Sequence, residues 1–307
     1  MVKAVRSTAC SPAVYKLLCY VSRRPRILML HGVGHADNEV ATFRAQIAFL
    51  QRYFEIVPLG DILHPPRSAH SLRPRIALTF DDGLRNNYSV VWPILREFRA
   101  PATFFVCPGL IESRQWLWNH ECRARLDSMP QELRRQFAQR VGLDEAESRF
   151  IVSALKYVPR REREGIQEEI REATPHFTPT EAQLKRYDIM TWQELRSLDP
   201  ELIAVGAHTT HHEILTGLDA ERLESEVSGC REWLERALHR PTLYFCYPDG
   251  AWNDRVVSYV ERYFSLAVTT EEALVPRRPS PLRLPRIPLP DSPDLEALAW
   301  RMQRPTA

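Results

Sequence analysis

Two adjacent carboxylates are the first residues of the sequence whose types suggest chemistry. Asp81 and Asp82 directly follow the apolar run 76–80, and Gly83 follows them. Successive side chains of a strand point to opposite faces, so a turn at Gly83 must re-aim the pair. Neighbouring carboxylates raise each other's pKa unless a cation or hydrogen bonds intervene. The alternative is an Asp-Gly turn that caps the next helix, and the motif alone does not separate the two.

Histidines further along the chain favour a metal site. His208 and His212 lie four residues apart and follow the apolar run 203–205. One helical turn between them would place both imidazoles on one face. Two neutral imidazoles with one carboxylate are a common open zinc set, which leaves a position for water or substrate. His211 falls off that face, and we expect it to be a bystander.

Short apolar runs that are rich in β-branched and aromatic residues are typical of buried strands. They cover 27–30, 76–80, 103–106, 203–205, 243–246 and 266–268, and 284–289 is a last extended segment. Segments with helical periodicity lie between or after them, at 42–53, 88–98, 220–238, 253–263 and 292–303, the last capped by Asp291 or Ser292. Strands that alternate with helices predict a parallel sheet of the α/β class.

The segment 119–186 interrupts that alternation. It is dense in Arg and Glu, has helical spacing and contains Pro159, Pro175 and Pro179. We interpret it as a helical insertion between two barrel strands, and we expect a solvated excursion without chemistry. The predicted domains are a basic helical extension at 1–25, a barrel at 26–290, and a C-terminal helix and tail at 291–307.

The composition fits one large globular domain. The chain has 307 residues, of which 44% are hydrophobic, enough for a single core. A net charge of +2 gives no sign of the strongly basic face of a nucleic-acid binder. The six cysteines are scattered without a CxxC pair, so we expect reduced thiols in a reducing compartment.

The N-terminus does not resemble a signal peptide. Its apolar run at 14–21 is short and interrupted by Lys16. No stretch approaches the ~20 apolar residues that a membrane span needs. We therefore expect a cytoplasmic protein without a transmembrane segment. Residues 12–24 are expected to form a short amphipathic helix that packs on the domain, the alternative being a weak contact with a membrane surface.

The motifs together resemble those of the polysaccharide deacetylase family, the carbohydrate esterases that carry a NodB homology domain. The matching segments are Thr-Phe-Asp-Asp-Gly at 79–83, His-Thr-Thr-His-His at 208–212, Met-Thr-Trp-Gln-Glu-Leu at 190–195, Phe-Cys-Tyr-Pro-Asp-Gly at 245–250, Leu-Pro-Arg-Ile at 284–287, and His31 after the first strand. The resemblance spans roughly 26–290. It implies a distorted (β/α)7-type barrel with a helical insertion, whose active site lies at the carboxyl ends of the strands.

The resemblance also implies roles for individual residues. Asp82, His208 and His212 would hold one divalent metal, zinc in the first place, with cobalt or manganese as alternatives. Asp81 would be the general base. The third motif of the family supplies a backbone N–H to the oxyanion, and that position points to Tyr247.

The sequence departs from the family at two places. The third motif often carries an arginine that orients the base, but Cys246 occupies that position here. Arg286 is the candidate replacement, the alternative being a surface ion pair. The family's late Leu-x-His acid is missing, since no histidine follows His239. His31 is the candidate replacement.

Three tryptophans are candidates for stacking on sugar rings, which is a common use of exposed aromatic faces. They are Trp116, Trp118 and Trp252, and Trp252 is favoured because it follows the third motif. Packing in the core or in a loop is the alternative for each of them.

The expected function is a metal-dependent hydrolase that removes acetyl groups from N-acetylated sugars in a polysaccharide, oligosaccharide or glycolipid. One alternative is an O-acetyl esterase on acetylated polysaccharide, and another is a degenerate carbohydrate-binding barrel. A phosphoryl-transfer site is disfavoured, because Mg²⁺ sites seldom use two histidines.

Overall fold

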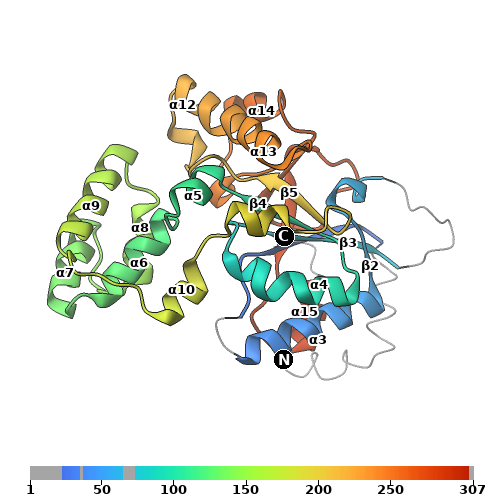
Figure 1. Cartoon of the computed structure of the whole chain (residues 1–307), viewed down its shortest axis with the longest axis horizontal. Coiled ribbons are helices and arrows are strands. Elements are labelled where there is room, and N and C mark those ends of the chain that lie inside the picture. The colour runs from blue at the N-terminus through green and yellow to red at the C-terminus, as the bar shows by residue number, and fades with distance from the viewer. Residues whose placement is uncertain (1–22, 35–36, 65–72, 304–307) are drawn as a thin grey trace, which may run out of the picture.

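Seven parallel strands close into a barrel in the computed structural model, which describes residues 23–34, 37–64 and 73–303 (Figure 1). The sheet order is β1-β8-β7-β6-β5-β4-β3, and β1 also pairs with β3, so the ring is closed. The strands are β1 (Arg26–Leu30), β3 (Arg75–Phe80), β4 (Ala102–Val106), β5 (Ile203–Ala207), β6 (Tyr244–Cys246), β7 (Leu266–Glu272) and β8 (Leu284–Pro288). The predicted (β/α)7-type fold is therefore confirmed.

The strands are mostly apolar because both of their faces are buried. On β1, Ile27 belongs to the cluster inside the barrel, whereas its neighbour Leu28 packs against the helices outside. On β4, Phe105 points inward and Phe104 outward in the same way. A Cβ at Gly206 would lie 2.5 Å from the ring of Phe105, so this glycine makes room for the ring in the barrel interior.

One strand was not predicted from the sequence, and two, β5 and β7, were predicted too short by two or more residues. The two-residue β2 (Glu55–Ile56) pairs with the start of β3 and lies outside the closed ring. It is too short to produce a recognisable alternation of side chains. The strand β7 continues to Glu272 rather than ending at residue 268. The register of its pairing with β8 shifts between Val268 and Glu272.

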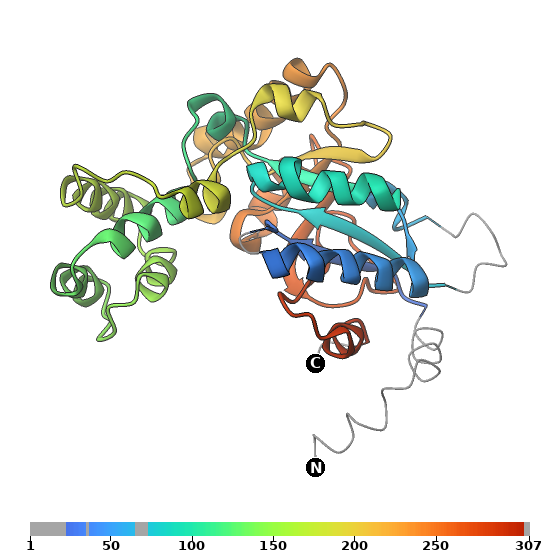
Figure 2. The ribbon, with the colours of Figure 1, turned by 60° about the horizontal axis from the view of Figure 1, so that its bottom comes forward.

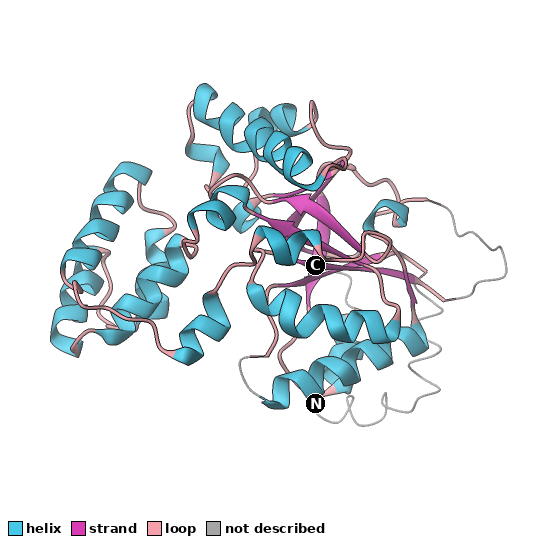
Figure 3. Cartoon of the chain, in the orientation of Figure 1, coloured by secondary structure: helices cyan, strands magenta, loops and turns pink. Residues whose placement is uncertain are grey.

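Helices cover the outside of the barrel (Figure 3). They are α3 (Asp37–Tyr53), α4 (Trp92–Phe98), α5 (Pro108–Ser113), α11 (Trp192–Arg196), α12 (Ala220–Glu224), α13 (Cys230–Leu238), α14 (Asp254–Val260) and α15 (Leu295–Arg301). The expectation that Asp291 or Ser292 caps the N-terminus of α15 is wrong. Asp294 caps this helix, since its carboxylate accepts the N–H groups of Glu296 and Ala297.

The insertion between β4 and β5 forms a helical lobe beside the barrel (Figure 2). Its helices are α6 (Trp118–Ser128), α7 (Gln131–Arg140), α8 (Ser148–Leu155), α9 (Arg160–Glu172) and α10 (Glu181–Tyr187). Helices α6 to α9 enclose a hydrophobic cluster of their own, to which Leu126, Ile151 and Ile170 contribute fully buried side chains. The expectation of a solvated helical excursion did not include this core, in which the amphipathic helices bury their apolar faces against one another.

Two further expectations concern cysteines and membranes. Cys107, Cys122, Cys230 and Cys246 are buried free thiols, which fits the expectation of reduced cysteines. Within the described ranges, no helix is long and apolar enough to cross a bilayer. The predicted N-terminal helix and its membrane contact fall largely on residues 1–22, outside the described part of the chain.

Because the lobe has its own core, Leu126→Ala should destabilise it locally. Removal of this buried side chain is expected to cost about 2–5 kcal/mol. Hydrogen exchange should show faster exchange in α6 to α9 with little change in the barrel strands. Leu184→Ala, at a position 41% exposed in the same insertion, is the matched control and should stay within about 0.5 kcal/mol. Equal loss of protection in β3 and β5 would show that the lobe is not a separate cooperative unit.

Candidate metal centre and active site

Polar side chains gather at the rim formed by the carboxyl ends of the parallel strands. Asp81 and Asp82 follow β3, and His208 follows β5. Tyr247 follows β6, and Arg286 lies in β8. The barrel thus brings together residues that are far apart in the sequence, at the end where barrel active sites lie.

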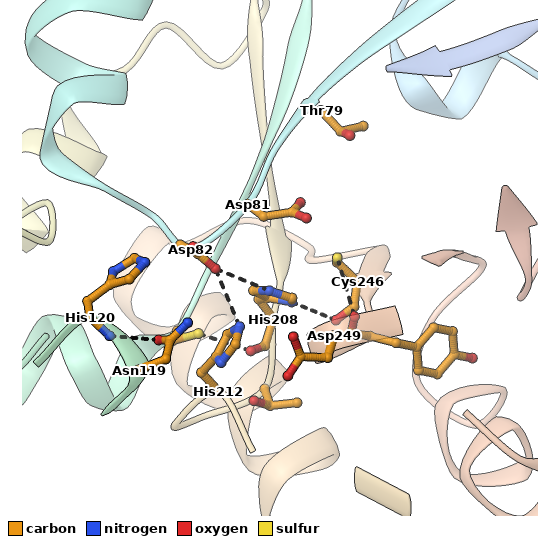
Figure 4. A network of polar contacts seen from close by, with 12 residues as sticks. Thr79, Asp81, Asp82, Asn119, His120, His208, His212, Cys246 and Asp249 are labelled. Carbon is orange, nitrogen blue, oxygen red and sulfur yellow. Dashed lines mark hydrogen bonds and ion pairs between the residues drawn. The ribbon is translucent and has the colours of Figure 1, made fainter. Parts of the chain in front are cut away.

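The side chains of Asp82, His208 and His212 converge with the spacing of a metal site (Figure 4). The carboxylate Oδ1 of Asp82 lies 3.5 Å from Nε2 of His208 and 3.4 Å from Nε2 of His212. These separations exceed ordinary hydrogen-bond distances. With ligand bonds of ~2.1 Å, the edge of a tetrahedral coordination sphere is ~3.4 Å. The three buried ligand atoms therefore fit a tetrahedral divalent ion that keeps one open position.

The surroundings of His208 fix which of its nitrogens faces that position. Its Nδ1 lies 2.8 Å from the backbone carbonyl of Cys246. A carbonyl only accepts hydrogen bonds, so Nδ1 carries a proton and Nε2 is the nitrogen that faces Asp82 and could bind an ion. The Nδ1 of His212 is buried and has no hydrogen-bond partner among the described residues.

The loop that carries the two histidines is not a helical turn, which corrects the sequence interpretation. Thr209 and His212 adopt left-handed φ angles of 60° and 59°, and Asp82 adopts 73°. Such conformations are costly for non-glycine residues and persist where the surroundings enforce them. The hydroxyl of Thr209 accepts the N–H of Glu213, and the thiol of Cys107 donates to the His208 carbonyl. Both bonds brace the loop around the ligands.

Arg286 holds the second carboxylate, Asp81, in a bidentate ion pair. Nη1 and Nη2 of Arg286 each donate to one oxygen of Asp81 at 2.7 Å, and both side chains are buried. Arg286 is thus not a surface ion-pair partner. Burial alone would raise the pKa of Asp81, but the charge and hydrogen bonds of Arg286 outweigh it and place this pKa below its ordinary value. Asp81 is therefore a carboxylate at neutral pH.

Cys246 occupies the family's usual arginine position and leaves room for Arg286. Its sulfur lies 3.2 Å from Nη2 of Arg286, in the buried space beside Asp81. Burial raises the pKa of the Cys246 thiol, so the group stays neutral and accepts the guanidinium N–H. The orienting arginine is thus supplied by β8 instead of by the third motif.

The expectation for Tyr247 is not supported by the structure. Its backbone N–H donates to the carbonyl of Val268 at 3.2 Å. Its phenol donates to the carbonyl of Leu282 at 2.9 Å. Both donors are engaged inside the protein, so Tyr247 offers neither of them to an oxyanion. The reason is that β6 and β7 remain paired at this residue, which the sequence motif does not reveal.

The tryptophan candidates are engaged as well. The guanidinium of Arg283 lies over the ring of Trp252 at 4.8 Å, and the ring packs against the core. Arg163 covers Trp118 in the same manner, and the indole N–H of Trp116 donates to Asp188. All three rings are partly buried and take part in these contacts, and stacking of a sugar on them stays a prediction.

His31 lies exposed at the rim after β1 and lines a cavity of about 350 Å³. The cavity lies between the first strand, the segment after β8 and the helical insertion, and its lining includes Leu84, two residues after Asp82. His120 of α6 lines the same cavity, and Figure 4 shows it near Asp82. Sequence reasoning missed His120, because a single histidine in a segment rich in Arg and Glu carries no pattern.

The environment keeps His120 neutral. Burial lowers its pKa to about 4, a shift that Asp82 opposes and that His212 and His31 increase. Its ring stacks on Tyr187 with centroids 4.7 Å apart. The Nδ1 atom is buried and has no partner in the described part of the chain.

Ion pairs attach the helical lobe to the loops of the metal centre. Arg160 and Arg163 of α9 both pair with Glu213, the residue after His212. Lys156 at the end of α8 pairs with Asp249 of the third motif. The insertion therefore supports two of the loops that form the site, a role that its composition did not indicate.

The ligand geometry predicts that His212→Gln lowers the affinity for Zn²⁺ by more than ~100-fold. Substitution of a residue that only supports a metal ligand already lowers metal affinity by about 10–100-fold, and His212 is itself a proposed ligand. Titration against a chromophoric chelator measures it. His211→Gln is the matched control, because the half-exposed ring of His211 bonds Glu226 instead. Equal losses in both variants, or none in the first, would contradict this ligand set.

Comparison with known proteins gives the family. The sequence profile of the polysaccharide deacetylase family matches residues 69–145 and 156–264, together more than half of the chain. YxkH of Bacillus subtilis (strain 168), a protein named as a polysaccharide deacetylase, is 25% identical over 89 residues. That match covers 29% of this chain and 32% of YxkH, so the chain spans about a third of this relative's length.

Solved structures share the fold over most of the chain. The deacetylase PplD of Streptococcus pyogenes, solved in complex with acetate, has a TM-score of 0.60 at 17% identity, covering 92% of this chain and 99% of PplD. IcaB of Ammonifex degensii has a TM-score of 0.57 at 17% identity, covering 92% and 97%. The profile match, together with this shared architecture, shows that the chain belongs to the polysaccharide deacetylase family.

Proposed function

We propose that this protein is a metal-dependent hydrolase that removes the acetyl group from N-acetylated sugars in a polysaccharide, oligosaccharide or glycolipid. The observation that carries the proposal is the placement of an ionised Asp81 beside the Asp82, His208 and His212 cluster. Zinc fits this donor set best, since two imidazoles and one carboxylate suit it better than harder cations.

A divalent ion at this cluster would supply electrophilic activation of the acetyl carbonyl and of a water molecule. The chain supplies the proton acceptor. Asp81 is ionised, and each of its oxygens keeps a lone pair beyond the bond to Arg286. Asp81 is therefore suited to take the proton of the attacking water, and Arg286 keeps the carboxylate oriented.

Cleavage of an amide also requires a proton for the leaving amine. His31 is the proposed donor, because it lies at the same rim and lines the cavity beside the metal centre. Its ring is exposed at this rim and is therefore accessible to a bound substrate. The oxyanion donor is not assigned to Tyr247, whose N–H is engaged with Val268.

An acetate-release screen tests the proposal. The zinc-loaded protein is incubated with N-acetylglucosamine oligomers, peptidoglycan, nucleotide sugars and acetylated xylan. Release from the N-acetylated substrates supports amide hydrolysis. Release from acetylated xylan alone would instead assign O-acetyl esterase activity, and binding of the sugars without release would indicate a carbohydrate-binding barrel.

Asp81→Asn should abolish most of the activity while the metal stays bound. The loss of a general base is expected to lower kcat by roughly 10²–10⁴-fold. Acetate release measures the first effect, and zinc content of the purified variant measures the second. A variant that retains normal turnover would show that Asp81 is not the base, and a variant without zinc would show that Asp81 also supports the metal.

Arg286→Gln should move the acid limb of the pH–rate profile upward. Arg286 holds the pKa of Asp81 below its ordinary value, so without it burial dominates and this pKa rises. The acid limb of kcat/KM is expected to move to higher pH by roughly 1–3 units. Activity is lost first at low pH, because Asp81 is then protonated and no longer acts as a base. Arg262→Gln, at an exposed ion pair with Glu224, is the control and should leave the profile unchanged. An unshifted limb in Arg286→Gln would contradict this role.

A further inference from the structure

The cavity beside the metal centre has one wall contributed by the helical insertion. His120 and Arg123 of α6, with Arg186 and Tyr187 of α10, line that side. His31 at the end of β1 lines the side nearest to the barrel rim. His120 lies near Asp82 (Figure 4), so this wall is the part of the cavity next to the candidate metal ligands.

Arg123 differs from most arginines of the insertion in having no acidic partner. Arg125, Arg135, Arg140, Arg149, Arg160, Arg163 and Arg171 each form an ion pair with a glutamate. In the described part of the chain, no ion pair is formed by Arg123, and its Nε is buried without a hydrogen-bond partner. A partly buried guanidinium with an unsatisfied donor is costly unless a ligand or water completes it.

Arg186 presents a second cation to the same cavity. Its guanidinium lies over the ring of Tyr187 at 5.5 Å, and it forms no ion pair with any described residue. The adjacent Lys185, by contrast, pairs with Glu181. The Tyr187 ring also stacks with His120, so Arg186 and His120 both contact one aromatic side chain, and Arg123 lines the same cavity.

Two carboxylates also line the cavity, and both lie away from the insertion. Glu39 belongs to α3, and its carboxylate already accepts the N–H of Gly34. Asp291 lies in the segment after β8. The positive charge is thus concentrated on the wall next to His120, which itself is neutral.

From this arrangement we infer that Arg123 and Arg186 form an anion subsite for the substrate, an inference that rests on the proposed deacetylase function. The substrate would be an N-acetylated sugar that carries a phosphate or a carboxylate on or next to the acetylated ring. Guanidinium groups bind both anions through paired, charge-assisted hydrogen bonds. His120 would add a neutral hydrogen bond to the sugar.

Binding to the zinc-loaded Asp81→Asn protein tests the subsite without turnover. The probes are methyl N-acetylglucosaminide, N-acetylglucosamine 1-phosphate, and N-acetylglucosamine linked to glucuronic acid, each measured by calorimetry. One or both anionic probes should bind at least ~10-fold more tightly than the neutral glycoside, and the difference should shrink at high salt. The probe that gains affinity distinguishes a phosphate from a carboxylate. Equal binding of all three would overturn the inference.

Substitutions then localise the effect. In the Asp81→Asn background, Arg123→Gln and Arg186→Gln should each lower the affinity for the anionic probe by roughly 10- to 100-fold and leave that for the neutral glycoside unchanged. Arg123→Lys should restore part of the loss. Arg149→Gln, at an exposed pair with Glu147 in the same insertion, is the control and should change neither affinity.

Outcomes for the subsite and for the proposed function are separable. Anion-dependent binding without acetate release from any substrate by the unsubstituted enzyme would overturn the deacetylase proposal. Acetate release from neutral oligomers, with binding that ignores the anion and both arginines, would overturn the subsite alone. Circular dichroism of each variant shows that the lobe remains folded, since neither arginine holds an ion pair whose loss would strand a buried partner.

Discussion

The buried ion pair between Arg286 and Asp81 is the interaction on which the arrangement of the site depends. A charge pair removed from water is stable only if its remaining donors are satisfied. The five N–H donors of Arg286 all have acceptors: two go to Asp81, and one each goes to Thr79, Cys246 and the carbonyl of Thr269. These acceptors lie on β3, at the end of β6 and on β7, so one side chain of β8 ties the barrel together just below the metal centre.

The strands were predictable from the sequence because their environment is uniform. Both faces of a barrel strand are buried, and runs such as 76–80 and 103–106 are therefore apolar except for one threonine each, Thr79 and Thr103. The features that were missed depend on local details. β2 has two residues, and the cap of α15 was chosen among closely spaced polar residues, of which Asp294 has the geometry. The hydrophobic core of the lobe was not predicted, because its segment is rich in Arg and Glu and each helix has only a narrow apolar face.

The candidate site was predictable where a motif places several residues within a few positions. Asp81, Asp82, His208 and His212 fall in such motifs, and the structure brings them together. The conformation of the histidine loop, with left-handed φ angles at Thr209 and His212, was not predictable, because contacts such as that of the Cys107 thiol with the His208 carbonyl form only in the folded chain. The same limit applies to Tyr247, whose N–H is bound by the neighbouring strand, and to His120, which reaches the site only through the packing of the lobe.

The packed interior of the barrel determines how a substrate can enter and how a product can leave. The Phe105 ring fills the space above Gly206, and Ile27, Ala77 and Val268 close the remaining volume with side chains that are fully buried. Solvent and solute therefore have no axial passage, and whatever enters must leave by the same mouth. A long glycan cannot be threaded through such a body and has to lie across its opening. In a deacetylase of the proposed kind, the released acetate would then leave past the bound sugar chain or after that chain has dissociated.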